Sequence, residues 1–238
     1  MITIGDASSE QVQIRASLDA GVTQPQLMMW QYSQPALVLG RSQRPSPELL
    51  GRAMDERIAL VSRSSGGGAV MAGPWMLSLT LLLPAAHELA RASLPAGYRS
   101  VGDACRRALG RFRIPTEIAR AAATRISAQP PQPGQPDWAC FATVSHGELL
   151  TAGGRKIVGI AQVRRRDSVA ICVGVLVDQP DWGALVRIWL GREDANVVRQ
   201  LERRTACCTE MAARDRTFSF RSLATALKSE LPTCRLAA

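Results

Sequence analysis

Three consecutive glycines, Gly66 to Gly68, follow Ser64 and Ser65 between two short apolar runs. Glycine loses the most backbone entropy on folding, so a turn alone rarely needs three of them. Without side chains, a loop backbone can approach a ligand closely and donate its N–H groups to it. The segment is neither a Walker loop nor a G-x-G-x-x-G fingerprint. The sequence therefore predicts either a ligand-binding loop or a flexible hairpin loop.

Lys156 is notable because 27 of the 29 basic residues are arginine, and Lys228 is the only other lysine. In such a chain, a retained lysine indicates that a compact ammonium is needed where a planar guanidinium would not serve. An ammonium can bind a carboxylate or phosphate, or transfer a proton. We predict a functional amine, with a solvated strand residue as the alternative.

Cys140 lies sixteen residues before Lys156 and directly precedes Phe141. A thiolate is a strong nucleophile, and a nearby ammonium both favours the thiolate and can stabilise an oxyanion. A small buried hydrophobic residue is the alternative. The six cysteines contain no Cys-x-x-Cys pair, and no metal-ligand cluster can be recognised. We expect the other five cysteines to pack in the interior.

The two histidines and a run of arginines at 164–166 carry weaker signals. His146 is expected in an exposed loop, and His87 lies near a predicted helix start with nothing to pair it. The three arginines could meet an acidic partner or a phosphate. A solvated hairpin end is the default interpretation.

Short apolar runs and helical spacing predict the elements that position these residues. Ahead of residue 128 we predict strands at Pro35–Gly40 and Arg57–Arg63, a hairpin from the runs Ala69–Met71 and Met76–Leu83, and a helix from Tyr98 to Phe112. Behind residue 136, three strands form a meander whose corners are Gly153-Gly154 and 165–168, and helical patterns follow at Trp182–Leu190 and Phe220–Leu231. Strands and helices come in blocks, which favours an α+β fold with a mostly antiparallel or mixed sheet.

The Pro-rich segment 128–136 is the only linker-like stretch in the chain. Its prolines exclude both helix and central strand. One fold interrupted by a loop and two domains are both compatible with it. We predict a single domain over residues 1–238, with no separate C-terminal accessory domain.

Composition and charge restrict the class of protein. Hydrophobic residues make up 46% of the 238 residues, which is enough for a core. No apolar run approaches the roughly 20 residues that a membrane span needs, and no export signal is recognisable, so we expect a cytoplasmic protein with reduced thiols. The net charge of +9 suggests an acidic partner. The sequence argues against nucleic acid as that partner, because aromatic residues are only 5% and no basic run is interleaved with them.

Three ordered motifs together resemble the lipoate–protein ligase and octanoyltransferase family of the biotin/lipoate ligase superfamily. They are the segment Trp30–Gln43, R-x-S-G-G-G-A-V from Arg63, and G-R-K-I-x-G-x-A-Q from Gly154. The resemblance covers about residues 30–178. It implies an α+β fold related to class II aminoacyl-tRNA synthetase catalytic domains, with helices flanking a mixed or antiparallel sheet.

The resemblance also implies roles for individual residues. Lys156 would contact the carboxyl or phosphate oxygens of an activated acyl group, as a preorganised cation. The residues expected to form the substrate site are Arg63, Ser65, Gly66, Gly67, Gly68, Gly159 and Ala161. The run Trp75–Leu77 could line an apolar channel or simply pack in the core.

Cys140-Phe141 resembles the cysteine of octanoyltransferases and amidotransferases that pass the acyl chain through a thioester. Such an enzyme would attach an octanoyl or lipoyl group to a lysine of an acceptor lipoyl domain. The expected partner is an acidic lipoyl domain or an acyl-carrier protein. A lipoate ligase would instead activate the free acid with ATP, and any Mg²⁺ would come with the nucleotide. A non-catalytic acyl-carrier-binding or regulatory module on the same fold is the alternative to both.

The chain departs from the family pattern at three places. Ser62 replaces a frequent arginine, Met71-Ala72-Gly73 replaces tyrosine-histidine-aspartate, and Val173-Gly174-Val175 stands where H-G-[ST] usually closes the meander. Polar contacts to acyl-adenylate or acceptor are thus partly missing. Either the substrate differs, or the activity is altered or lost.

Overall fold

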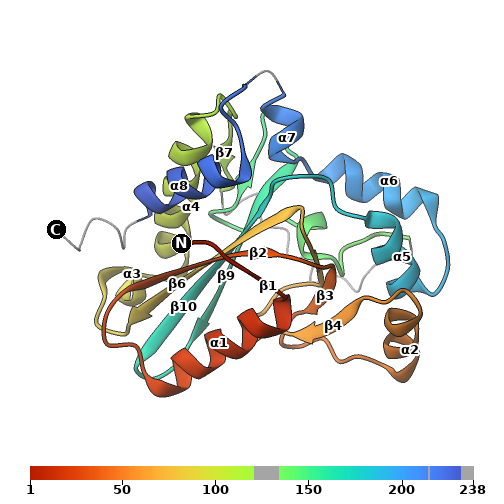
Figure 1. Cartoon of the computed structure of the whole chain (residues 1–238), viewed down its shortest axis with the longest axis horizontal. Helices are drawn as coiled ribbons and strands as arrows, with labels where there is room; N and C mark the ends of the chain where they lie inside the picture. Colours follow the sequence, from red (N-terminus) through yellow and green to blue (C-terminus); the bar gives the residue numbers. More distant parts are fainter. Residues whose placement is uncertain (121–133, 214, 232–238) are drawn as a thin grey trace.

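The computed structural model describes residues 1–120, 134–213 and 215–231. Its centre is a seven-stranded sheet, which Figure 1 shows with helices on both sides. The strands, in spatial order, are β1 (Thr3–Gly5), β2 (Gln26–Tyr32), β6 (Met76–Pro84), β10 (Ser168–Leu176), β9 (Lys156–Arg164), β8 (Leu149–Leu150) and β7 (Glu117–Ile118). β1 and β2 are parallel and the other pairs are antiparallel, so the sheet is mixed.

A smaller sheet has the order β4 (Ala59–Ser62), β3 (Ala36–Leu39) and β5 (Val70–Ala72). The helices are α1 (Ala7–Ala20), α2 (Pro47–Asp55), α3 (Glu88–Arg91), α4 (Leu94–Gly110), α5 (Trp182–Leu190), α6 (Ala195–Arg204), α7 (Cys208–Met211) and α8 (Phe220–Glu230), with a 3-10 turn η2 at Cys140–Ala142. In Figure 1, α4 and α8 lie together at the upper left, whereas α2 and α5 lie near the small sheet at the right.

The two faces of strand β6 have different partners, because successive strand residues point to opposite sides of a sheet. The leucines at alternate positions are completely buried in a core formed with α4 and α8; they are Leu77, Leu79, Leu81 and Leu83. Met76, Ser78 and Thr80 point to the other face. α1 and the small sheet cover that face, and the site described below lies between them and the large sheet.

Local capping explains where the covering helix α1 begins and ends. The Asp6 carboxylate accepts a hydrogen bond of 2.7 Å from the backbone N–H of Ser9, which satisfies an otherwise free donor of the first turn. Gly21, with φ of 79°, ends the helix in a conformation that glycine adopts easily. This segment was not predicted as a helix, because the first half of α1 is mostly polar.

Most of the predicted elements are confirmed. The back part forms the expected meander β8–β9–β10, with a hydrogen bond from the N–H of Arg165 to the carbonyl of Ser168 closing its second corner. α5 has the predicted bounds, and α8 ends one residue earlier than predicted. α4 begins at Leu94, four residues before the predicted start at Tyr98, since Pro95 fits in the first turn of a helix.

The predicted hairpin of the runs at 69–71 and 76–83 is wrong. A turn does join them, with the N–H of Met76 donating to the carbonyl of Gly73 at 2.9 Å. The two strands then enter different sheets: β5 pairs with β3, whereas β6 pairs with β2 and β10. The turn chemistry was recognisable in the sequence, but the long-range partners of each strand were not.

The linker prediction at 128–136 lies mainly outside the described residues. The segments on either side of it contribute to the same seven-stranded sheet, in which β6 lies beside β10. Among the described residues, no helix combines the length and the apolar character needed to cross a bilayer. The single-domain organisation stays a prediction.

Candidate active site

Cys140 begins the η2 turn and is tied to the segment that follows the glycine loop. Its backbone N–H donates to the carbonyl of Ala69 at 2.8 Å, and the N–H of Ala69 donates to the carbonyl of Trp138 at the same distance. At Gly68 a Cβ atom would lie 2.4 Å from that Trp138 carbonyl oxygen. Only glycine allows this close approach, so one function of the loop is to let the Cys140 segment pack against it.

Helices α5 and α6 support the same segment from the other side. The Arg204 guanidinium donates to Asp137 at 2.9 Å and to the carbonyl of Ala142 at 3.2 Å. The rings of Trp138 and Trp189 are stacked, with centroids 4.7 Å apart. The residues on both sides of Cys140 are therefore fixed by polar and aromatic contacts, while its own side chain is partly exposed.

Lys156, the first residue of β9, is one of the most completely buried side chains, with 1% of its surface exposed. Its ammonium lies 2.7 Å from the Glu148 carboxylate and donates to the carbonyls of Cys140 at 2.9 Å and Thr143 at 3.1 Å. It also lies 4.0 Å from the Cys140 sulfur and 5.1 Å from the centroid of the Phe141 ring. The solvated strand residue considered as an alternative is thus wrong.

Glu148 is the buried counter-ion of this lysine, and it was not singled out as a functional residue. Its exposed fraction is 1%, and one carboxylate oxygen accepts from the backbone N–H of Ser145 at 2.7 Å. The other accepts from the N–H of Ile160 at 3.2 Å, in addition to its contact with Lys156. A buried charge is stable only when it is paired and hydrogen-bonded, and both conditions are met here.

The glycine loop lies against Arg63 and Cys140. The Arg63 guanidinium donates to the carbonyls of Gly66 and Gly68, each at 2.9 Å. Gly67 has φ of 98°, and a Cβ atom there would lie 4.0 Å from the Cys140 sulfur. Within the described residues, no hydrogen bond uses the backbone N–H of residues 66–68, so these donors are available to a ligand.

An inner cavity and an outer cleft meet at Cys140. The inner cavity extends between the large sheet and α1, and its walls include Val38, Met76, Phe141 and Gly174. The outer cleft is bordered by the glycine loop, Lys156 and the start of α4. Cys140, Ile160 and Ala161 border both spaces. A chain lying in the inner cavity would therefore present its reactive end to the thiol and the ammonium.

All the predicted site residues border one or both of these spaces. Arg63, Ser65, Cys140, Gly159 and Ala161 line the inner cavity. The three loop glycines Gly66, Gly67 and Gly68, together with Lys156, line the outer cleft. Their proximity supports the roles assigned to them, and these roles stay predictions.

The run Trp75–Leu77 divides between the two interpretations offered for it. Met76 lines the inner cavity, whereas Leu77 is packed in the core beneath the sheet. Trp75 packs against the buried residues around the small sheet and α5, and it donates its ring N–H to the carbonyl of Met71 at 3.0 Å. Among the departures from the family pattern, Ala72 lines the cavity, Val173 is buried, and Ser62 is exposed.

The histidine and cysteine predictions need correction at three positions. His87 does have a partner, since its Nδ1 accepts a hydrogen bond from the N–H of Leu89 and caps α3. His146 is only partly exposed and borders the outer cleft. Cys172 is not fully packed, because it lines the inner cavity, whereas Cys105, Cys207 and Cys208 are buried as predicted. Cys234 lies outside the described residues.

Burial raises the pKa of three of these thiols, those of Cys105, Cys172 and Cys208. The pKa of Cys172 rises to about 11 and that of Cys105 to about 12. None of the three is a thiolate near neutral pH, so none competes as a nucleophile. In the described part of the chain, no group of three histidine, cysteine or acidic side chains is placed to hold a metal ion.

Several solved structures have the same fold. Lipoate-protein ligase A bound with ATP has a TM-score of 0.69 at 17% identity, covering 97% of this chain and 82% of that one. Protein Ta0514 of T. acidophilum with bound lipoic acid gives a TM-score of 0.67 at 18% identity, with coverage of 97% and 82%. The predicted α+β fold of the lipoate ligase type, with helices flanking a mixed sheet, is confirmed.

The family relationship follows from the sequence match. Residues 9–231 match the lipoyl protein ligase A/B catalytic domain, and the chain belongs to this family. Two curated relatives are octanoyltransferases LipM. The enzyme of Exiguobacterium sp. is 28% identical over 152 residues, which are 63% of this chain and 53% of the relative. That of Moorella thermoacetica is 30% identical over 149 residues, 61% of this chain and 50% of the relative. The matched segment thus spans about half the length of these relatives.

Proposed function

We propose that the protein transfers an octanoyl or lipoyl group from a carrier thioester to a lysine of an acceptor lipoyl domain, through a thioester on Cys140. The observation that carries the proposal is the position of the Cys140 sulfur. It lies where the inner cavity opens into the outer cleft, 4.0 Å from the Lys156 ammonium. The similarity to two octanoyltransferases supports the same chemistry.

In the first half of the reaction, the Cys140 thiolate attacks the carbonyl carbon of the carrier thioester. The carbon–sulfur bond to the carrier breaks, and the carrier thiolate leaves and takes up the proton that Cys140 lost. Negative charge develops on the carbonyl oxygen in the transition state. The N–H groups of the glycine loop, which no hydrogen bond within the described residues uses, and the Lys156 ammonium border the outer cleft and would offset that charge.

In the second half, the acceptor lysine attacks the acyl-enzyme as a neutral amine. An amide bond forms, the bond to Cys140 breaks, and the amine proton returns to the cysteine sulfur. The two halves together consume no external acid, base or oxidant. The outer cleft would admit first the carrier arm and then the acceptor side chain, because both must reach Cys140 from the surface.

The acceptor belongs to the proposal on two grounds. A solved relative in fold is described as a bipartite lipoate protein ligase with its E2 lipoyl domain, at a TM-score of 0.68 and 16% identity. The net charge of +9 favours an acidic domain as the acceptor here. We place the reaction in the cytoplasm, where a reducing environment keeps Cys140 as a free thiol.

Mass spectrometry of the intact protein after mixing with an octanoyl-carrier thioester tests the proposal. We expect one acyl adduct, located on Cys140 by peptide mapping. Cys140→Ser should lose adduct and turnover, because a hydroxyl is far less acidic than a thiol. Cys105→Ala, which removes a core thiol that does not line the cavity, should keep both.

Two other results would contradict the thioester route. Full activity of Cys140→Ser with free lipoate, dependent on ATP and Mg²⁺, would identify an ATP-dependent ligase instead, since adenylation needs no protein nucleophile. A folded wild-type protein that binds an acyl carrier but is inactive in both assays would identify the non-catalytic module.

A further inference from the structure

Two and four residues along β6 from Met76, which lies beside Phe141, the lining of the inner cavity includes polar side chains, which an unsubstituted alkyl chain would not need. Glu10 of α1, Tyr32 of β2, and Ser78 and Thr80 of β6 all line it. Their exposed fractions are 2%, 4%, 8% and 0%. They lie on the cavity face of the sheet, because Ser78 and Thr80 alternate with the core-facing leucines of β6.

The hydrogen bonds in this group leave one donor unused. Tyr32 and Ser78 donate their hydroxyl protons to the two carboxylate oxygens of Glu10, the latter at 2.6 Å. The Thr80 hydroxyl has no hydrogen-bond partner of normal geometry within the described structure. Across the strand pair this hydroxyl lies opposite Cys172, whose sulfur interacts with it but is only a weak acceptor. A completely buried hydroxyl without a hydrogen bond of normal geometry is rare and calls for an explanation.

We propose that the far end of the acyl cavity recognises a neutral hydrogen-bonding group, so that the preferred substrate is a medium-chain acyl group with a hydroxyl at its distal end. The inference rests on the proposed function only in placing the acyl carbonyl at Cys140 and the tail in the inner cavity. A distal hydroxyl accepts from Thr80 and donates to an oxygen of the Glu10–Ser78 pair. Such a hydroxyl therefore gives the Thr80 hydroxyl an acceptor and uses a free lone pair of the oxygen to which it donates.

Competing tails fit this end of the cavity less well. An unsubstituted octanoyl chain expels water and leaves Thr80 unpaired, and a site that can bind a hydroxyl discriminates against an analogue that lacks it. The dithiolane of a lipoyl group offers sulfur, a weak acceptor. A distal carboxylate would place a second acid beside Glu10, the pKa of which is already raised by burial.

Calorimetric titration with unreactive amides tests the proposal apart from catalysis. The probes are octanamide, 8-hydroxyoctanamide and lipoamide. For the wild-type protein we expect 8-hydroxyoctanamide to bind about tenfold tighter than octanamide, since a net hydrogen bond to a buried group contributes about one power of ten. Thr80→Val, which replaces the hydroxyl by a methyl group of similar size, should abolish this preference, and Thr80→Ser should keep it.

Thr116→Val is the matched control, because Thr116 also has a buried hydroxyl without a partner but does not line the cavity. It should keep the preference, and the unfolding temperatures of all variants show that they are folded. Equal or weaker binding of 8-hydroxyoctanamide, tighter binding of lipoamide, or an unchanged preference in Thr80→Val would overturn the proposal and leave the acyl cavity in place. Binding of no amide at all would overturn the cavity assignment, and the proposed function with it.

Discussion

The Lys156 ammonium already uses its three protons on three oxygen atoms, those of Glu148, Cys140 and Thr143. It therefore acts on the Cys140 sulfur as a fixed charge at 4.0 Å. Glu148 holds this charge in place and is itself held by two backbone N–H groups. The pair is a preorganised unit, and removal of one partner leaves the other as an uncompensated charge in the interior.

A double-mutant cycle on this pair should show strong coupling. Lys156→Met and Glu148→Leu should each lower the free energy of unfolding by about 3–5 kcal/mol, whereas the double variant should lose less than the sum. Chemical denaturation measures all three values. Both single variants should also lose acyl transfer. Because the ion pair is buried, loss of the lysine side chain should lower stability as well as activity.

Independent, additive losses of stability would contradict the coupling. Retention of transfer by Lys156→Met in a protein that is still folded would remove the lysine from the mechanism.

Gly67 needs to be glycine for a local reason that does not apply to its neighbour Gly66. Its φ of 98° is unfavourable for any residue with a Cβ, and a Cβ would lie 2.8 Å from the Arg63 guanidinium. Gly67→Ala should therefore cost about 1–2 kcal/mol of stability and lower the rate of acylation of Cys140. Gly66→Ala is the control, because a Cβ there meets nothing within 4 Å. Stopped-flow acylation and thermal unfolding provide the two readouts, and equal effects of both substitutions would contradict the assignment.

The sequence predicted those residues of the candidate site that stand out by residue type or by local motif. The glycine run, a lysine among arginines, and the Cys140-Phe141 pair are visible in the chain without knowledge of its fold. Glu148 could not be recognised in this way, because its importance comes from burial beside Lys156. A carboxylate next to two leucines, in a segment leading into a strand, is the one signal that could have indicated it.

At the scale of elements, strand existence was predictable and strand partners were not. The meander β8–β9–β10 follows from neighbouring runs joined by short turns, so local sequence determines its pairing. β5 and β6 are neighbours in sequence but pair in different sheets, which only the long-range packing decides. Helix α1 escaped prediction because its first half is polar, although it supplies Glu10 to the cavity.

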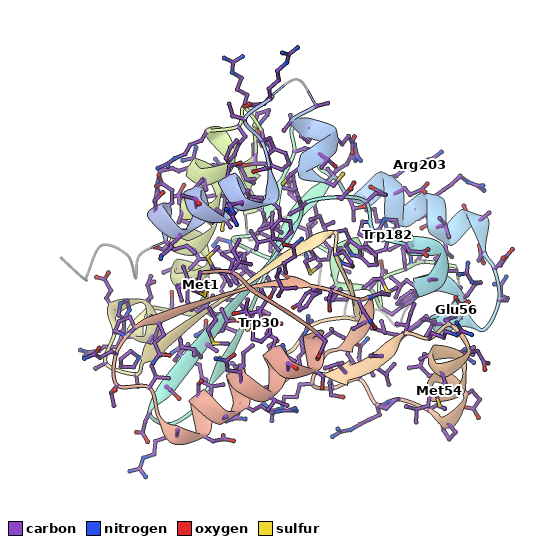
Figure 2. The ribbon with its side chains drawn as sticks, viewed as in Figure 1. Met1, Trp30, Met54, Glu56, Trp182 and Arg203 are labelled. Atoms are coloured by element: carbon purple, nitrogen blue, oxygen red, sulfur yellow. The ribbon has the colours of Figure 1, made fainter. Side chains whose placement is uncertain are left out.

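Helices α2 and α5 are joined by side-chain contacts at the edge of the small sheet. Figure 2 shows Glu56, at the end of α2, directed toward α5, while Met54 points outward from the same helix. The Arg187 guanidinium makes two hydrogen bonds to the Glu56 carboxylate, at 2.6 and 3.0 Å. Arg52 of α2 donates to the carbonyls of Ile188 and Trp189 near the end of α5. These contacts brace α5, whose Trp189 stacks on Trp138 beside Cys140.

The contribution of the Glu56–Arg187 pair should depend on pH with a definite sign. The hydrogen bonds that the Glu56 carboxylate accepts from Arg187 lower its pKa below the usual 4.5. The folded state therefore binds this proton less readily than the unfolded state, so the pair contributes stability above about pH 4.5 and loses it as the pH falls through the lowered value. Because both side chains are partly exposed, we expect only about 0.5 kcal/mol.

Thermal unfolding of wild type and Glu56→Gln between pH 3 and pH 7 measures this. The difference should be present at pH 7 and should vanish at the acid end. A difference that is constant over the whole range would show that the substitution acts through packing. Glu202→Gln, at an exposed position on α6, is the control.

At the scale of the whole molecule, part of the positive charge lies close to the site. Gln162 of β9 borders the outer cleft, and the exposed arginines at 164–166 continue from it to the hairpin end. At about 3.3 Å per residue, this end lies within roughly 13 Å of the cleft. The interpretation as a solvated hairpin end agrees with the exposure of Arg165 and Arg166, and Arg165 pairs only distantly with Asp19, at 3.8 Å. The Arg164 guanidinium instead donates to the backbone carbonyls of Ala90 and Ala92. An acidic domain that presents a lysine to the cleft would therefore face positive charge.

Transfer to an acidic acceptor domain should accordingly weaken as salt is added. Salt screens exposed charges over about 10 Å at 0.1 M, so we expect the KM for the acceptor domain to rise at least about threefold between 50 and 300 mM NaCl, with kcat little changed. Acylation of Cys140 by a small neutral octanoyl thioester should not respond, because no long-range attraction brings that substrate to the cleft.

The double substitution Arg165→Gln/Arg166→Gln should reduce the salt dependence, whereas Arg203→Gln on α6 (Figure 2), an element that does not border the cleft, should preserve more of it. If salt slowed both half-reactions equally, the charge would act on the chemistry or the fold, and the acceptor would dock without electrostatic steering.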